Sequence, residues 1–265
     1  MKRRLGHLET QVLAYAQMRQ TQTIRTGELA RSLRLPPQQV QEVIARLTRR
    51  GLTVRVRRGL YLVPQRLPLG GAWSPDPILA LNTLMEDRDA RYQICGPNAF
   101  NRYGFDEQVP ARLYVYNNRL SRDRTIGSVE ITFIKIADGR LGGTEELTTP
   151  EGLKAVYSSR VRTLVDAVYD WSRFSSLPRA YEWIRQELSR GRVTAADLAR
   201  ATVEYGNQAT LQRIGFLLER EGASRSVLTT LRKSLPPSAS VIPWNPVGSK
   251  RGTVDRRWRI ILNEP

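Results

Sequence analysis

The sequence predicts an α+β protein: an amino-terminal winged helix-turn-helix domain, then a larger mixed α/β domain with a small sheet and a helical half. Within the first 66 residues, three helical patterns give way to a strand pattern. A stretch rich in proline and glycine follows at residues 64–77 and is typical of a connector. Strand and helix patterns both occur after it. We expect domains at 1–66 and 78–265, joined by a linker at 67–77.

Apolar residues recur at helical spacing in three segments of the first domain, beginning with residues 6–19. Thr26 is placed to cap a second, short helix, because its hydroxyl can accept a backbone N–H of the first turn. The third helix is expected at residues 37–50, where proline is tolerated in the first turn. Gly51 can end this helix in the left-handed conformation.

The apolar period changes after the third helix. Apolar and polar residues alternate over 52–57, as in a half-buried strand. Arg58 and Gly59 are suited to a tight turn, and residues 60–63 form the returning strand. Three helices followed by a basic hairpin make up a winged helix.

Positive charge is concentrated in this first domain. Residues 1–66 contain fourteen basic residues and three acidic ones, a balance of +11 out of +17 for the whole chain. A solvated surface normally mixes both signs, so a one-sided excess indicates a polyanionic partner. Nucleic acid is the partner that this composition favours.

The winged helix places its third helix in the major groove and its hairpin along the DNA backbone. Glutamine can pair with adenine and arginine with guanine, so exposed side chains of the third helix are expected to read bases. These residues are Gln38, Gln39, Gln41 and Arg46. The phosphate contacts expected from the remaining basic residues are Lys2, Arg3, Arg4, Arg49, Arg50, Arg55, Arg57 and Arg58. Glu42 either accepts from a cytosine or is a solvated helix residue.

The second domain mixes strand and helix signals. Strands are expected at 92–95, 112–116, 128–136 and 257–262, and short helices at 75–86, where Ser74 serves as the cap, and at 96–104. The chain is expected to turn helical from Thr149 onward. The helices should begin near Ser159, Pro178, Thr194, Asn207 and Ser224.

Composition excludes several classes of protein. Cys95 is the only cysteine and His7 the only histidine, so one chain can form neither a disulfide nor a Cys/His zinc site. No apolar stretch approaches the roughly 18 residues that span a bilayer. The basic start lacks the apolar run of a secretory signal. We expect a cytoplasmic protein with no membrane segment.

Enzyme motifs are missing as well. The sequence has no Gly-rich phosphate loop and no nucleophile elbow. A nucleotidyltransferase needs a Gly-Ser turn leading to metal-binding carboxylates, but no Asp-x-Asp follows the Gly-Ser pair at 127–128. Asp166 and Asp170 lie one helical turn apart, with Arg162 and Arg173 as expected ion-pair partners. We expect no enzyme activity and no cofactor.

Several segments together resemble the AbiEi family of antitoxins, which are the transcriptional regulators of bacterial type IV toxin-antitoxin (abortive infection) systems. The resemblance begins with the winged helix and its Arg-Arg-Gly-Leu-Tyr hairpin at 57–61. It continues through Cys-Gly-Pro-Asn-Ala-Phe-Asn-Arg-Tyr-Gly at 95–104 and Ser-Ser-Arg-Val-Arg-Thr-Leu-Val-Asp-Ala at 158–167. Arg-Ile-Gly-Phe-Leu-Leu-Glu at 213–219 and Arg-Trp-Arg-Ile at 257–260 extend it towards the end of the chain.

The resemblance implies a repressor that binds inverted repeats in the double-stranded promoter DNA of its own operon. It also implies a second domain that counters a nucleotidyltransferase-like toxin encoded in the same operon, with or without direct contact. The family's DNA-contacting basic residues map onto Arg46, Arg49, Arg50, Arg57 and Arg58. Two alternatives stay open: a winged-helix regulator whose second domain senses a small ligand or protein partner, and a nucleic-acid-modifying enzyme.

Overall fold

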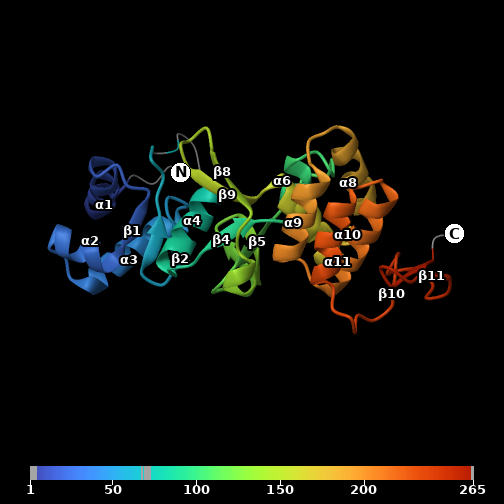
Figure 1. Ribbon diagram of the computed structural model, residues 1–265. Coiled ribbons are helices and arrows are strands. Elements are labelled where there is room, and N and C mark those ends of the chain that lie inside the picture. The colour runs from blue at the N-terminus through green and yellow to red at the C-terminus, as the bar shows by residue number, and fades with distance from the viewer. Residues whose placement is uncertain (1–4, 67, 69–72, 264–265) are drawn as a thin grey trace.

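The structure is a computed structural model that describes residues 5–66, 68 and 73–263. The elements lie in a row (Figure 1). Helices α1 to α3 are at one end, a six-stranded sheet lies in the middle, and a group of helices follows. A small three-stranded sheet, β10-β12-β11, lies at the far end. The described part is therefore a mixed α+β structure with helices and several sheets, as the sequence predicted.

The first 66 residues contain three helices and a three-stranded antiparallel sheet of order β1-β3-β2. The elements are α1 (His7–Met18), β1 (Thr23–Arg25), α2 (Thr26–Leu33), α3 (Pro37–Arg49), β2 (Val54–Arg57) and β3 (Leu60–Leu62). All three predicted helices and the hairpin are present. Strand β1 was not predicted because three residues are too short for a period-2 signal.

The apolar stripes of these helices meet in one core. Val12, Val40, Ile44 and Leu47 are fully buried in it. Gly51 follows α3 with φ +69°, the left-handed conformation expected for a helix end. The predicted positions of two strands and three helices thus follow from one buried face per element.

The predicted cap of α2 is wrong. Thr26 is the first residue of the helix, and the N-cap is Arg25, which makes no side-chain hydrogen bond there. The Thr26 N–H instead donates to the carbonyl of Gly59 at 3.0 Å. Because the hairpin turn already satisfies this backbone group, α2 begins directly at the end of β1 without a side-chain cap.

The middle part is a mixed sheet of order β6-β7-β5-β4-β9-β8. Its elements are α4 (Pro77–Asp87), β4 (Tyr92–Ile94), α5 (Pro97–Arg102), β5 (Leu113–Asn117), β6 (Arg122–Ile126), β7 (Val129–Lys135), β8 (Thr144–Thr148) and β9 (Lys154–Ser158). Alternate residues of the strands face two different cores. Val115 and Phe133 pack with α4, whereas Tyr116 and Ile134 pack with the helical part. The sheet is therefore covered on both faces.

The hairpin β2–β3 joins the first part of the chain to this middle part. Val54 and Leu62 belong to the same apolar cluster as Ile78 and Leu81 of α4. The Trp73 N–H donates to the carbonyl of Gly51 at 2.8 Å. The basic hairpin is consequently fixed against α4 as well as against its own helices.

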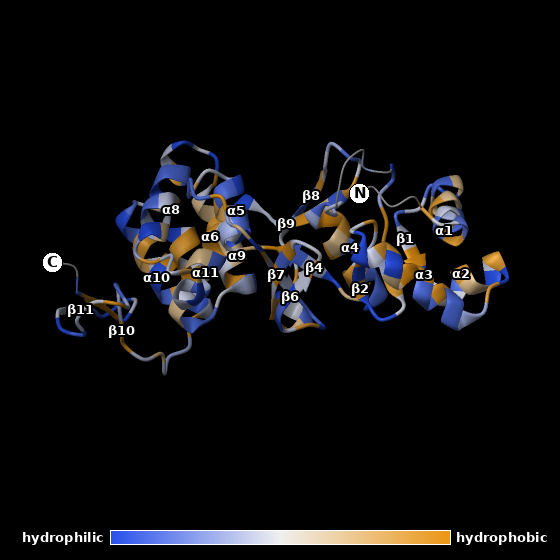
Figure 2. Cartoon of the chain, turned by 180° about the vertical axis from the view of Figure 1, so that it is seen from behind, coloured by the Kyte–Doolittle hydropathy of each residue, from blue (hydrophilic) through white to orange (hydrophobic). Residues whose placement is uncertain are grey.

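The remaining chain forms the helical part and the terminal sheet. The elements are α6 (Arg160–Tyr169), α7 (Trp171–Phe174), α8 (Arg179–Ser189), α9 (Ala195–Tyr205), α10 (Gln208–Arg220), α11 (Arg225–Ser234), β10 (Ile242–Pro243), β11 (Thr253–Asp255) and β12 (Ile260–Leu262). Ser159, Thr194 and Asn207 cap α6, α9 and α10 through their side chains, which confirms these predicted helix starts. Figure 2 shows hydrophobic residues along the central strands and the helices that pack on them.

The structure differs from the predicted elements at the following places. The helical character expected from Thr149 onward is wrong for residues 154–158, which form β9. Strand β6 escaped prediction because four of its five residues are exposed, so apolar and polar residues do not alternate. Asp76, rather than Ser74, caps α4, accepting from the Ile78 and Leu79 amides at 2.7 and 3.1 Å. The terminal strand, expected at 257–262, is shorter, and β12 begins at Ile260.

The expected ion pairs of α6 are present. Arg162 Nε lies 2.9 Å from Asp166, and both side chains are buried. Arg173 Nε lies 3.7 Å from Asp170, whose carboxylate also accepts from the Tyr116 hydroxyl at 2.5 Å. The hydrogen bond between Tyr116 and Asp170 therefore links the helical part to the sheet.

Packing of the terminal sheet onto α10 should be sensitive to Gly215. A Cβ at this position would overlap the indole ring of the buried Trp258. We expect Gly215→Ala to lower the free energy of unfolding by about 1–3 kcal/mol, the usual cost of overpacking. Gly27→Ala in α2, which meets no atom within 4 Å, should instead raise it by about 0.5–1 kcal/mol. Urea unfolding followed by tryptophan fluorescence tests both, and an unaffected Gly215→Ala variant would contradict this packing.

Candidate nucleic-acid interface

The exposed face of α3 carries the expected base-reading glutamines. Gln38 and Gln41 are exposed, and Gln39 is half-buried. Arg49 is exposed and lies on the same stripe as Gln38 and Gln41, because it follows them by eleven and eight residues, close to three and two helical turns. The opposite face is the buried one of the first core. This division leaves two glutamines, one arginine and the exposed Glu42 on the outward face of a helix held by its apolar side.

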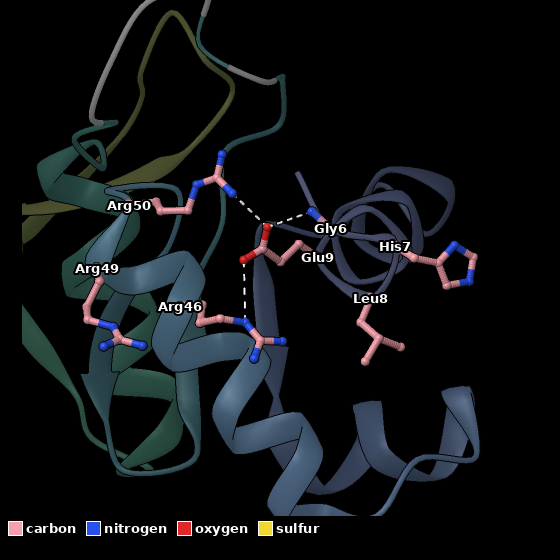
Figure 3. Close-up of a pocket in the computed structure, with 7 residues that line it drawn as sticks. All are labelled: Gly6, His7, Leu8, Glu9, Arg46, Arg49 and Arg50. Atoms are coloured by element: carbon pink, nitrogen blue, oxygen red, sulfur yellow. Dashed lines mark hydrogen bonds and ion pairs between the residues drawn. The ribbon is translucent and has the colours of Figure 1, made fainter. Parts of the chain in front are cut away.

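Arg46 and Arg50 lie on a different side of α3 and reach towards α1 (Figure 3). Arg46 Nε is 3.6 Å from one oxygen of Glu9, and Arg50 Nη1 is 2.7 Å from the other. The Gly6 amide also donates to Glu9 at 2.9 Å. Glu9 is buried, and these three donors compensate its charge. Arg46, expected to read a base, is thus oriented by a carboxylate.

A cleft of about 670 Å³ opens between the start of α1 and the end of α3. It is lined by Gly6, His7, Leu8, Glu9, Arg46, Arg49 and Arg50 (Figure 3). In Figure 3 Arg49 points away from Glu9, whereas Arg46 and Arg50 point towards it. Three arginines against one carboxylate give the cleft a net positive charge, which suits an anionic group.

The hairpin presents its three arginines in two ways. Arg55 and Arg58 are exposed. Arg57 is bound by Asp87 at the end of α4, through both its Nε and Nη2 atoms. Arg25 of β1 donates from Nη1 to the same carboxylate at 3.0 Å. The predicted residues Arg55, Arg57 and Arg58 therefore lie together, with a carboxylate that the sequence gave no reason to place there.

Two residues of this arrangement were missing from the sequence prediction. Arg25 lies in the short strand that periodicity did not reveal, and Asp87 follows it by 62 positions. Asp87 is almost completely buried, with 4 % of its side chain exposed. Hydrogen bonds from Arg57 and then from Arg25 lower the pKa of Asp87 to about 2, against the opposing effect of burial. The same contact raises the pKa of Arg57.

The amino-terminal residues Lys2, Arg3 and Arg4, expected to contact phosphates, lie outside the described residues. Their role stays a prediction. Helix α1 begins at His7, which is exposed.

Chemistry-bearing side chains elsewhere are buried or dispersed. Cys95 is fully buried, and burial raises the pKa of its thiol well above the usual value. Within residues 5–66, 68 and 73–263, no group of three or more His, Cys, Asp or Glu side chains is placed to hold a metal ion. Across that same part of the chain, no helix combines the length and apolarity needed to cross a membrane.

Comparison with known proteins identifies a family for the first part of the chain. The model of a family described as "Transcriptional regulator, AbiEi antitoxin" matches residues 11–64. The match confirms the expected resemblance over residues 11–64, which include α2, α3 and the hairpin, and does not extend to the later segments that carry the resemblance. No curated protein matches the sequence of the chain.

The fold as a whole is similar to a solved structure. The RV2827C protein from Mycobacterium tuberculosis superposes with a TM-score of 0.62 over 98% of this chain and 92% of that one. The two sequences are 18% identical over this alignment. This similarity concerns the fold alone.

The low pKa of Asp87 makes a prediction about acid stability. Because its pKa is lowered in the folded state, the ion pairs stabilise the fold fully above about pH 5, and this stabilisation is lost as the pH falls towards 2. Allowing for solvent screening, the contribution is about 1–2 kcal/mol. Urea unfolding of wild type and Asp87→Asn at pH 6, 4 and 3 should show a gap that narrows with acid. A gap independent of pH would contradict the assignment.

Proposed function

We propose that the chain is a sequence-specific DNA-binding autorepressor and antitoxin, which counters a nucleotidyltransferase-type toxin encoded in the same operon. The observation that carries the proposal is the basic, outward face of α3 and the hairpin within residues that match a family of transcriptional regulators and antitoxins. The protein acts in the cytoplasm without a cofactor and as a regulator rather than an enzyme.

The order of elements supports a winged helix. Helices α2 and α3 are followed by the hairpin β2–β3, and β1 completes the sheet on the other side of β3. In this fold α3 enters the major groove, and its first turns face the base edges. Gln38 and Gln41, exposed on those turns, are the proposed base readers, with Gln39 on the flank.

The basic side chains divide between two proposed roles. Arg49, Arg55 and Arg58 are exposed and meet phosphates directly. Arg46 and Arg50 are anchored on Glu9 near the end of α3, where a fixed guanidinium suits a phosphate better than a base. Lys2, Arg3 and Arg4 extend the phosphate contacts at the amino-terminal side. The exposed glutamines of α3 and these basic side chains together form one proposed surface for one DNA duplex.

The antitoxin role is assigned to the residues after the hairpin. The description of the matching family includes antitoxin function, and the match itself covers only the proposed DNA-binding residues. The chain outside residues 1–66 carries a net charge of +6 over 199 residues, so it lacks the strong basic excess of the first 66 residues. This part therefore has a different partner, which is the toxin or the target that the toxin modifies.

Binding to the promoter of its own operon should depend strongly on salt. With about five phosphate contacts, the slope of log affinity against log salt should be near −4 to −5. Arg58→Ala should weaken binding to promoter and random DNA alike, because its proposed partner is a phosphate. Arg200→Ala, which removes an exposed arginine from α9, is the matched control and should bind as wild type. Fluorescence anisotropy measures the affinity of each of the three proteins for promoter and random DNA, and a flat salt response would overturn the DNA interface.

Base reading should be separable from this general affinity. Gln38→Ala should lower the preference for the promoter over single-base variants by about 1–3 kcal/mol at one base pair, while random DNA binds as before. Substitution of Glu204, an exposed residue of α9, by alanine provides a control in the helical part. Equal losses on promoter and random DNA would contradict the assignment of Gln38 to a base.

The antitoxin half is tested by co-expression. Growth arrest caused by the adjacent nucleotidyltransferase-like gene should be relieved by the full chain, and also by a chain carrying Gln38→Ala and Arg58→Ala, because the proposed DNA surface is not the antitoxin surface. The measurement is growth after induction of the toxin gene. Failure of the full chain to restore growth would reject the antitoxin role, whatever the outcome on DNA.

A further inference from the structure

Asp87 is an acidic residue whose carboxylate lies among arginines. It is the last residue of α4 and packs at the end of the hairpin, where its carboxylate contacts arginines from two strands. Arg25 ends β1, and Arg57 ends β2. Both arginines pair with Leu60 of the central strand β3, from opposite sides. The strand register therefore brings the two basic side chains to one level of the sheet.

The carboxylate holds Arg57 in a single orientation. Nε donates to one oxygen of Asp87 and Nη2 to the other, while Nη1 donates to the Arg58 carbonyl at 2.6 Å. A guanidinium has five N–H groups, so two remain for an acceptor outside the protein. Arg57 is half-buried. Its three hydrogen bonds within the protein fix the orientation of the guanidinium and therefore of the two N–H groups that remain.

Arg25 and Arg57 lie close together because both bind the same carboxylate oxygen of Asp87. Both donate to Oδ1, which brings two positive groups close together. Without a shared carboxylate these groups would repel each other and separate. Arg25 is the more exposed of the two, with half of its side chain accessible. The pair thus offers two adjacent, oriented guanidinium groups at the tip of the hairpin.

We propose that Asp87 is a positioning residue that holds Arg25 and Arg57 together as a clamp for one phosphate of the DNA backbone. This inference rests on the proposed DNA-binding function and adds to it a residue from the chain beyond the hairpin. The clamp binds phosphate better than two free arginines do, because their side chains are already ordered before DNA arrives. Phosphate is the group that matches paired guanidinium donors.

The opposite role for Asp87 is that of an internal competitor, which occupies the arginines in place of a phosphate. The two roles give affinities of opposite sign when the carboxylate is removed. A competitor lowers DNA affinity, so its loss would strengthen binding. A positioning residue raises affinity, so its loss weakens binding even though a negative charge has gone.

The experiment compares Asp87→Asn with Asp89→Asn. Asp89 is exposed and lies two residues further along, so its substitution removes the same charge without touching the clamp. Asp87→Asn should bind promoter and random DNA about tenfold more weakly than wild type, a change of about 1.4 kcal/mol. Its salt slope should be smaller by about 1, as for the loss of one phosphate contact. Asp89→Asn should bind as wild type or more tightly. If Asp87→Asn binds as tightly as Asp89→Asn, the positioning role is overturned.

A comparison of two single arginine variants does not use Asp87→Asn and so does not depend on the stability of that variant. Arg25→Ala should weaken binding to all sequences, whereas Arg91→Ala, which removes an exposed arginine outside the clamp, should not. Adding Asp87→Asn to a chain with Arg25→Ala and Arg57→Ala should cause no further loss. An equal effect of Arg25→Ala and Arg91→Ala, or an undiminished loss from Asp87→Asn in that background, would overturn the clamp. Failure of the wild-type chain to bind promoter DNA would instead reject the proposed function itself.

Discussion

Several carboxylates of this chain are buried, and each is compensated by at least two arginines; at Asp87 a third, Arg88, lies 4.0 Å away. Within the described residues this arrangement occurs at Glu9, Asp87, Asp166 and Glu187, with the arginine partners Arg46 and Arg50, Arg25 and Arg57, Arg140 and Arg162, and Arg160 and Arg192. A buried carboxylate that loses its partner costs about 3–5 kcal/mol, far more than an exposed ion pair contributes. These four groups therefore constrain which elements pack together: α1 on α3, the hairpin on α4, and α6 on its neighbours.

Apolar contacts on two sides also fix the position of the hairpin β2–β3. Val54 and Leu62 are part of the core beneath α4, whereas the adjacent Val63 belongs to the core of the first three helices. Successive residues of a strand point to opposite faces, which is why neighbouring positions enter different cores. The hairpin of the proposed DNA surface is consequently packed against both cores, which fixes its backbone relative to the first three helices and to α4.

Much of the fold was predictable because it follows from local patterns. Apolar periodicity located the helices, and the side chains of Ser159, Thr194 and Asn207 marked three of their starts. Periodicity failed for β6, a polar edge strand, and for β9, where a short strand was taken for helix. The site divides in the same way. The arginines of the hairpin were predictable from local sequence, but Glu9 with Arg50 and Asp87 with Arg57 are 41 and 30 residues apart, and no local pattern joins them.

The exposure of the arginines separates the four carboxylates into two kinds. At Asp166 both guanidinium groups are covered by aromatic rings, with Arg140 lying 3.4 Å from the centre of Tyr169 and Arg162 lying 4.0 Å from that of Tyr205. Such groups stabilise the interior and cannot reach a partner. At Asp87 one carboxylate serves two arginines whose outer edges are accessible, so the cluster keeps a net positive charge facing solvent. The pairing of one carboxylate with two arginines therefore stabilises the interior at Asp166, whereas at Asp87, near the surface, it holds two guanidinium groups in positions where they face solvent.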